Sequence, residues 1–290
     1  MDKRISAAAA VAQISDGMTV GIGGWGPRRK PMALVREILR SDLKDLTIVA
    51  YGGADVGMLC ASGKVKKVIF AFVSLDFIPL EPYFRQARQS GAIEVMEVDE
   101  GMMLLGLRAA AWGLPFIPTE VGLGTDILTH NPDIKVIDSP YDDKEWVAMP
   151  ALNLDVALIH ADRADARGVC QIEGPDHYLD DWMARAAKNT IVSCEEVVDT
   201  AYFQDPARAR QVFWERSITD AVVEIPGGAH PTSCNPQYGF DVPHFKAYNG
   251  SAKEGGFAAY AEQFLAATEA EYQERVGGLD AIRALPLPVY

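Results

Sequence analysis

The sequence predicts an α/β fold in which helices cover an open, mostly parallel sheet. Apolar runs of strand length alternate with segments whose apolar residues recur at three- and four-residue steps, as they do in helices. The first two apolar runs end on glycines, at the sheet edge where parallel sheets bind ligands. With 290 residues, 49% of them hydrophobic, the chain can bury a large core. We therefore predict one domain over residues 1–290.

The individual elements follow from these patterns. Pro31 fits the first position of a helix, because the missing N–H costs nothing there. The segment 116–145 has prolines and no clean period, so we expect an irregular excursion that could close over a site like a lid. Strands are expected at 18–22, 46–53, 65–75, 92–98, within 145–172, at 190–198 and from 221, and helices at 32–40, 82–91, 100–114, 180–189 and 256–276.

The composition excludes several classes of protein. A balance of 27 basic against 40 acidic residues gives a formal charge of −13, which disfavours a nucleic-acid partner. No apolar run reaches the roughly 18 residues of a membrane span, so no membrane association is expected. The four cysteines are widely spaced, which favours reduced thiols in a cytoplasmic protein. No metal is expected, since no ligand pair has a third ligand nearby.

The glycine-rich stretch Gly21–Pro31, "GIGGWGPRRKP", is the first candidate site. It joins a strand to a helix, so backbone N–H groups and three basic side chains could face one anion or polarised oxygen. We expect the N–H groups of Gly23 and Gly24 to hold an oxyanion. The glycines also match a dinucleotide fingerprint, but the helix begins late and no acid ends the second strand. A purely structural tight turn is the other alternative. The expected substrate-binding cations are Arg28, Arg29 and Lys30.

The ends of the next two strands extend this crevice. Gly52 and Gly53 close the second strand, and their amides would line the same cleft as the first glycine loop. Ser74 closes the third strand and is expected to line the cleft too, although a turn or capping role is the alternative for it.

An acidic stretch, "EVMEVDEGMM", supplies the candidate general base. Glu100 precedes an apolar helix at the predicted crevice, so partial desolvation would raise the pKa of its carboxylate toward neutrality. Glu97 and Asp99 are the alternative bases, and Glu97 is also expected to contact substrate. The competing interpretation is that Asp99 or Glu100 only caps the helix.

Longer motifs resemble the α subunits of the family I coenzyme A transferases over essentially the whole chain. They are "DGMTVGIGGWGPRRKPMALVREIL", "LPFIPTEVGLGTDIL" and "DVALIHADRADARGVCQI". The resemblance implies an open α/β sheet of the type found in sugar-phosphate isomerases. It also implies a homologous β subunit in an α2β2 heterotetramer, and a CoA thioester as substrate with no permanently bound cofactor.

Shorter motifs are similar to one branch of that family, the bacterial steroid ring-cleaving hydrolases. They are "GWGPRRKPMALVR", "YGGADVGML", "FVSLD", "DEGMM" and "PGGAHPTSC". This resemblance implies hydrolysis of a carbon–carbon bond in a cyclic β-keto acyl-CoA from cholesterol ring degradation. It implicates the acid in "DEGM", which is Glu100 here.

One departure keeps other functions open. Coenzyme A transferases use a glutamate nucleophile in a Glu-Asn-Gly setting after the second strand of the β-type half, whereas this chain has "AYGGADVG" at that strand end. CoA transfer would therefore require the glutamate of a partner subunit. The other alternative is a non-catalytic sensor that binds a phosphosugar.

Overall fold

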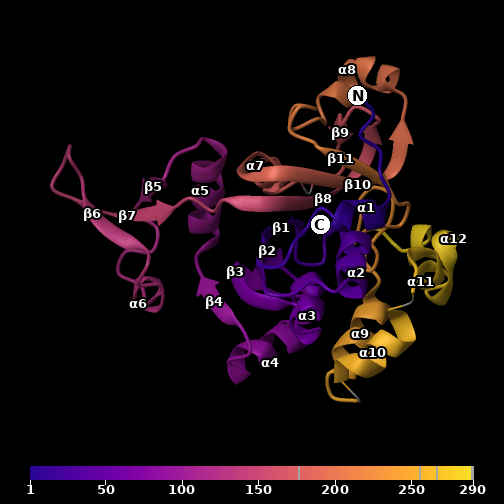
Figure 1. Cartoon of the computed structure of the whole chain (residues 1–290), viewed down its shortest axis with the longest axis horizontal. Coiled ribbons are helices and arrows are strands. Elements are labelled where there is room, and N and C mark those ends of the chain that lie inside the picture. The colour runs from indigo at the N-terminus through magenta and orange to yellow at the C-terminus, as the bar shows by residue number, and fades with distance from the viewer. Residues whose placement is uncertain (176, 255, 266, 289–290) are drawn as a thin grey trace.

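A computed structural model describes residues 1–175, 177–254, 256–265 and 267–288 (Figure 1). Within these residues the main sheet has eight strands in the order β11-β10-β8-β1-β2-β3-β4, with β9 beside β8. All neighbours on this path are parallel, and only β9 runs antiparallel. The predicted open, mostly parallel sheet is confirmed. Its strands are β1 Thr19–Trp25, β2 Leu46–Gly52, β3 Val65–Val73, β4 Glu94–Glu97, β8 Leu154–Asp165, β9 Cys170–Gln171, β10 Ala187–Val198 and β11 Ala221–Glu224.

Helices cover both faces of this sheet. Alternate residues of a strand point to opposite faces, so Ile48 and Ala50 of β2 pack into one core while Val49 and Tyr51 pack into another. The first core receives α1 Ala7–Val11, α2 Met32–Arg40, α3 Ala54–Ala61, α4 Pro82–Ser90, α9 Val242–Ser251 and α10 Gly256–Phe264, and the second receives α5 Glu100–Ala111 and α7 Asp180–Ala186. A 3₁₀ turn, Thr200–Gln204, and α8, Pro206–Ala209, precede β11.

Helix α2 covers the expected residues, Met32–Arg40, but Pro31 lies just before it. Pro31 is its N-cap rather than its first helical residue, with φ −74° and ψ 58°, and Met32 starts the helix. The residue before the helix still needs no N–H, so the reason for a proline here is unchanged.

The prediction that residues 116–145 are irregular is wrong. The segment contains β5, Phe116–Thr119, α6, Ile127–His130, and β6, Lys135–Asp138. Strands β5 and β6 pair with β7, Glu145–Pro150, in a three-stranded antiparallel sheet of order β5-β7-β6. This sheet projects from the main sheet beyond α5 (Figure 1). Four-residue strands are too short to show alternation, which explains why the pattern looked irregular. Closure over a site remains a prediction.

The single helix predicted over 256–276 is also wrong. Helix α10 ends at Phe264 and α11 spans Glu269–Arg275, with α12, Gly278–Arg283, after it. Thr268 caps α11, because its hydroxyl accepts from the Glu271 N–H while the Glu271 carboxylate accepts from the Ala267 N–H. The segment 256–276 has the apolar periodicity of one helix, but the capping-box residues Thr268 and Glu271 divide it into two.

Helix α11 is held on the domain by a buried cation. Arg36 of α2 donates to the Glu269 carboxylate through Nε and Nη2, and its guanidinium lies 3.6 Å from the Tyr272 ring centre. The C-terminal region therefore packs back on the domain.

Two further observations concern the chemistry expected from composition. In the described part of the chain, no helix has both the length and the apolar character that a membrane span needs. All four cysteines are free thiols in buried positions. The cytoplasmic location inferred from them stays a prediction.

Candidate active site

A cavity of about 250 Å³ lies at the carboxyl ends of the central strands. Its lining joins the end of β1, the end of β2, the first turn of α5 and the segment before α7. The predicted convergence of the glycine-loop strand and the acidic helix start on one cleft is therefore observed. The lining residues are Trp25, Tyr51, Glu100, Gly101, Leu104, Tyr178 and Leu179.

Larger cavities lie elsewhere, and the largest described one, about 450 Å³, is formed by α1, α2 and residues 41–43. These residues precede β2, so the cavity is at the amino-terminal edge of the sheet. Ligands of open parallel sheets bind at the opposite edge. We therefore place the active site in the smaller cavity.

Glu100 is the only acidic residue that lines the smaller cavity among the described residues. It opens α5, and Asp99 next to it is the N-cap, with its carboxylate 2.7 Å from the Gly101 N–H. The capping interpretation is thus correct for Asp99, and Glu100 lines the cavity. The predicted partial burial of Glu100 is wrong for this chain, because the residue is exposed.

Tyr51 fixes the start of α5 against the end of β2. Its hydroxyl donates to the backbone carbonyl of Glu100 at 2.8 Å. Burial, together with the nearby carboxylates of Glu100 and Asp99, raises the pKa of Tyr51, so the phenol stays protonated. The backbone that carries the candidate base is therefore held by a neutral donor.

The glycine loop is not an open anion site. Trp25 and Arg28 exchange two backbone hydrogen bonds of 2.9 Å, and the Gly26 N–H donates to the Tyr51 carbonyl at 3.2 Å. The Arg29 N–H donates to the Ser233 carbonyl, and the Lys30 N–H to the Thr232 hydroxyl. The expectation that these N–H groups face a ligand is wrong, and the tight-turn alternative describes the loop better.

Gly23 and Gly24 serve close packing against Asp180. The Gly24 N–H donates to Asp180 Oδ1 at 2.8 Å, so it is not available to an oxyanion. A Cβ on Gly23 would lie 2.7 Å from the same carboxylate oxygen. Gly24 has φ +74°, and a Cβ there would lie 2.4 Å from the Arg28 carbonyl oxygen, so only glycine fits. The oxyanion role predicted for Gly24 is therefore wrong.

Arg29 is a structural cation rather than a substrate-binding one. Its guanidinium lies 2.6 Å from Asp180 Oδ2 and 2.5 Å from the His160 carbonyl oxygen, and its side chain is 2% exposed. Burial opposes its charge, but the carboxylates of Asp180 and Asp162 outweigh that effect and hold the pKa of Arg29 above its usual range. The predicted substrate contact is wrong because the carboxylate partner comes from a distant helix.

Lys30, Gly52 and Gly53 also contact other groups of the protein rather than the cavity. Lys30 Nζ lies 3.1 Å from Asp55 Oδ2 with both side chains fully buried, and this burial lowers the pKa of Lys30. The Gly53 N–H donates to Asp55 Oδ1 at 2.7 Å, and a Cβ on Gly52 would lie 2.8 Å from Val56. The predicted ligand contacts of Lys30, Gly52 and Gly53 are wrong.

Next to Asp55, the buried carboxyl of Glu81 predicts a pH effect on stability. It accepts from the Phe84 N–H at 2.5 Å and the Tyr248 hydroxyl at 2.6 Å, yet burial raises its pKa from 4.5 to about 7. The folded state then holds this proton at pH values where the unfolded chain has lost it. We expect this carboxyl to contribute a fall of about 3 kcal/mol in the free energy of unfolding as pH rises from about 4.5 to 7. In urea unfolding across this range, the free energy of unfolding of the wild type should fall relative to that of Glu81→Gln as pH rises; parallel profiles would contradict this.

The remaining predicted contacts lie around the cavity rather than in it. Arg28 pairs with Asp76 at 2.8 Å and its guanidinium lies 4.7 Å from the Trp25 ring centre. The Ser74 hydroxyl accepts from the Asp76 N–H at 3.0 Å, which confirms the turn alternative. Glu97 forms a half-exposed ion pair with Arg88 at 2.5 Å and is absent from the cavity lining. The predicted substrate contacts of Ser74 and Glu97 are therefore not supported.

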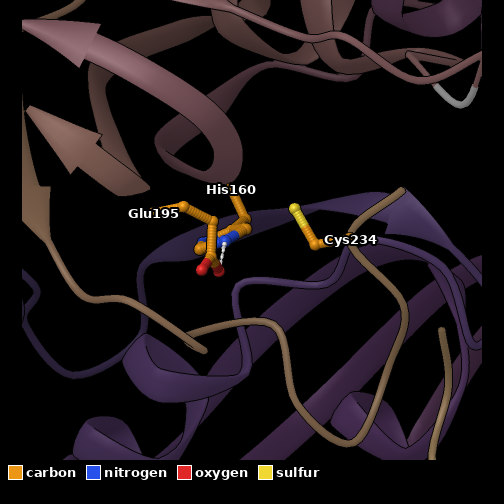
Figure 2. Close-up of side chains that lie close together, drawn as sticks. All are labelled: His160, Glu195 and Cys234. Atoms are coloured by element: carbon orange, nitrogen blue, oxygen red, sulfur yellow. Dashed lines mark hydrogen bonds and ion pairs between the residues drawn. The ribbon is translucent and has the colours of Figure 1, made fainter. Parts of the chain in front are cut away.

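A buried polar cluster behind the loop contains a histidine, a glutamate and a cysteine (Figure 2). The ligand atoms of His160, Glu195 and Cys234 lie within 4.8 Å of one another. His160 already has two partners, Ser193 at 2.8 Å and Glu195 at 2.9 Å, and Glu195 also accepts from Tyr238 at 2.7 Å. Burial raises the pKa of the Cys234 thiol well above its usual value, which disfavours the thiolate that metals bind.

His230 belongs to a similar cluster, with Tyr272 at 2.7 Å and Asp241 at 3.0 Å. His230, Asp241 and His244 also have ligand atoms within 4.8 Å of one another. His160 and His230 are therefore satisfied by hydrogen bonds within the protein and have structural roles. The expectation that no metal binds stays a prediction.

Sequence reasoning missed Trp25, Tyr51, Tyr178 and Asp180. Trp25 and Tyr51 stand in the motifs that drew attention to the glycine loops, and an aromatic residue at the end of a predicted strand was the available signal. Asp180 and Tyr178 lie more than 150 residues after the loop they contact and carry no local signal.

The family model for coenzyme A transferase matches residues 4–224. The chain belongs to the coenzyme A transferase family. The IpdA subunit of a cholesterol ring-cleaving hydrolase from Rhodococcus jostii (strain RHA1) is 45% identical over 283 residues, covering 95% of this chain and 96% of that protein. The IpdA subunit from Mycobacterium tuberculosis (strain ATCC 25618 / H37Rv) is 44% identical over 290 residues, covering 97% and 99%.

Solved structures of this family share the fold. Glutaconate coenzyme A-transferase from Acidaminococcus fermentans matches with a TM-score of 0.90 and 30% identity, covering 99% of this chain and 96% of the other. A variant of the decarboxylase AibA/AibB matches with a TM-score of 0.82 and 30% identity, covering 91% and 99%. The predicted coenzyme A transferase fold is confirmed.

Proposed function

We propose that this chain is the α subunit of an enzyme that hydrolyses a carbon–carbon bond in a cyclic β-keto acyl-CoA from cholesterol ring degradation. The observation that carries the proposal is the presence of Glu100 in the lining of a cavity with aromatic walls at the strand ends. The full-length similarity to the IpdA subunits supports the substrate class. The CoA thioester is the substrate, and no permanently bound cofactor is invoked.

The reaction needs one base and one electron sink. Glu100 accepts a proton from a water molecule as the water oxygen adds to the ring ketone. The alkoxide collapses to a carboxylic acid, and the bond to the α-carbon of the thioester breaks. That electron pair is delocalised into the thioester carbonyl as an enolate, and the α-carbon then takes the proton back from Glu100. The reaction has a single product, a ring-opened acyl-CoA that carries the new carboxylic acid. Water is the only co-substrate.

This chain alone does not complete the site. The N–H groups of Gly24 and Lys30 are bonded within the protein, so neither can stabilise the oxyanion. The cavity of about 250 Å³ is also below the roughly 300–1,000 Å³ of pockets that bury a whole drug-sized ligand. We therefore propose that a homologous β subunit, in an α2β2 assembly, covers the exposed Glu100 and supplies the oxyanion donors and CoA contacts.

An acceptor test distinguishes hydrolysis from CoA transfer, the alternative that the similarity to glutaconate coenzyme A-transferase keeps open. We expect the co-purified pair to convert 2-oxocyclohexane-1-carboxyl-CoA, a simple cyclic β-keto thioester, to a ring-opened dicarboxylic acid monothioester without any added carboxylate. Mass spectrometry should show a gain of one water and no free CoA. CoA movement that depends on an added carboxylate would instead establish transfer. The enzyme subunits found among the relatives disfavour the phosphosugar sensor.

A further inference from the structure

Four aromatic rings form a continuous wall beside Glu100. Trp25 and Tyr178 are stacked, with ring centres 5.5 Å apart and planes 19° apart. Tyr51 and Phe72 are stacked at 5.3 Å and 23°, and the Trp25 ring meets Phe72 edge-on at 4.8 Å. These residues come from β1, β2, β3 and the segment before α7, so the wall exists only in the folded chain.

Three of the four rings line the cavity, and most of the other lining residues are apolar. The three rings are those of Trp25, Tyr51 and Tyr178, and the rest of the lining is Leu104, Leu179, Gly101 and Glu100. Flat rings and leucine side chains offer a large area for C–H groups at little cost in side-chain entropy. Such a lining suits an alicyclic ring, whereas a two-carbon acyl group would leave most of it in contact with water.

The position of Tyr178 is set by its neighbours. Its φ of +38° is rare for a residue with a side chain, and such conformations persist where the surrounding structure imposes them. On one side its ring stacks on Trp25. Two residues later Asp180 is anchored to Gly24 and Arg29. Tyr178 is therefore held between the glycine loop and the start of α7.

We infer that Trp25 and Tyr178 form a subsite for the cyclic part of the acyl group, and that this subsite presents the ring ketone to Glu100. The inference rests on the proposed function, because it assumes that the cavity receives the acyl end of a CoA thioester. It goes further in assigning ring selectivity to two named aromatic residues of this subunit.

The test measures binding without turnover. In the co-purified pair carrying Glu100→Gln, isothermal titration is performed with 2-oxocyclohexane-1-carboxyl-CoA and with acetyl-CoA. We expect Tyr178→Ala to weaken binding of the cyclic thioester about tenfold, a typical truncation effect for a buried aromatic contact. Binding of acetyl-CoA should change less than about twofold, since a two-carbon acyl group covers little of the wall. Tyr178→Phe, which keeps the ring, should recover most of the cyclic affinity.

The control is Tyr141→Ala, which removes an aromatic side chain that is 96% exposed, in the turn between β6 and β7. It should leave both affinities unchanged. Equal weakening for both thioesters in Tyr178→Ala, or no weakening for either, would overturn the inference. Failure of the wild-type pair to hydrolyse the cyclic thioester while the ring preference persists would reject the proposed reaction and keep the subsite.

Discussion

Replacing Glu100 by Gln is expected to lower turnover of the cyclic thioester about a hundred- to ten-thousandfold, the usual contribution of a positioned general base. Gln keeps the size of the side chain and removes the ability to accept a proton from water. Because Glu100 is exposed in the cavity and Asp99 provides the helix cap, folding should be nearly unaffected, with a loss below about 1 kcal/mol from the helix dipole. Steady-state kinetics and gel filtration of the co-purified pair provide the measurement.

The matched control is Glu94→Gln, an exposed carboxylate on β4 outside the cavity lining, which should retain wild-type turnover. Full activity in Glu100→Gln would remove Glu100 from the mechanism. Activity lost in Glu97→Gln and kept in Glu100→Gln would assign the base to Glu97, despite its pairing with Arg88.

Asp180→Asn is expected to reduce the free energy of unfolding by about 3–5 kcal/mol, the cost of leaving one partner of a buried ion pair charged and unpaired. Asn can still accept the Gly24 hydrogen bond, but it cannot neutralise the Arg29 guanidinium. Both side chains of this pair are at most 2% exposed, so water cannot take the place of the missing carboxylate. Urea unfolding at pH 7 measures the loss.

Two further variants make this result specific. Glu120→Gln removes a carboxylate from an exposed pair with Lys144, 3.4 Å apart, and should cost less than about 1 kcal/mol. Adding Arg29→Met to Asp180→Asn should recover part of the lost stability, because the uncompensated charge is gone. An Asp180→Asn protein as stable as wild type would show that the Arg29 pair does not hold the glycine loop.

The Arg29–Asp180 pair shows why the sequence predicted the location of the site but not the partners of its side chains. Strand alternation and the position of Glu100 at a helix start are local properties, and a parallel sheet brings all its carboxyl ends to one edge. These facts placed the first strand end and Glu100 together, and the cavity confirms that placement. The basic run Arg28–Lys30, by contrast, resembles an anion site in any local view.

The sequence by itself determined the parallel sheet, its helix-covered faces and the edge where the site lies, because these follow from periodicities of two and 3.6 residues. Only the tertiary structure decided what the loop side chains do. Asp180 reaches Gly24 and Arg29 from α7, and Asp55 reaches Lys30 from α3. A buried cation is stable only beside its counter-charge, and that partner is chosen by strand order and helix packing rather than by distance along the chain.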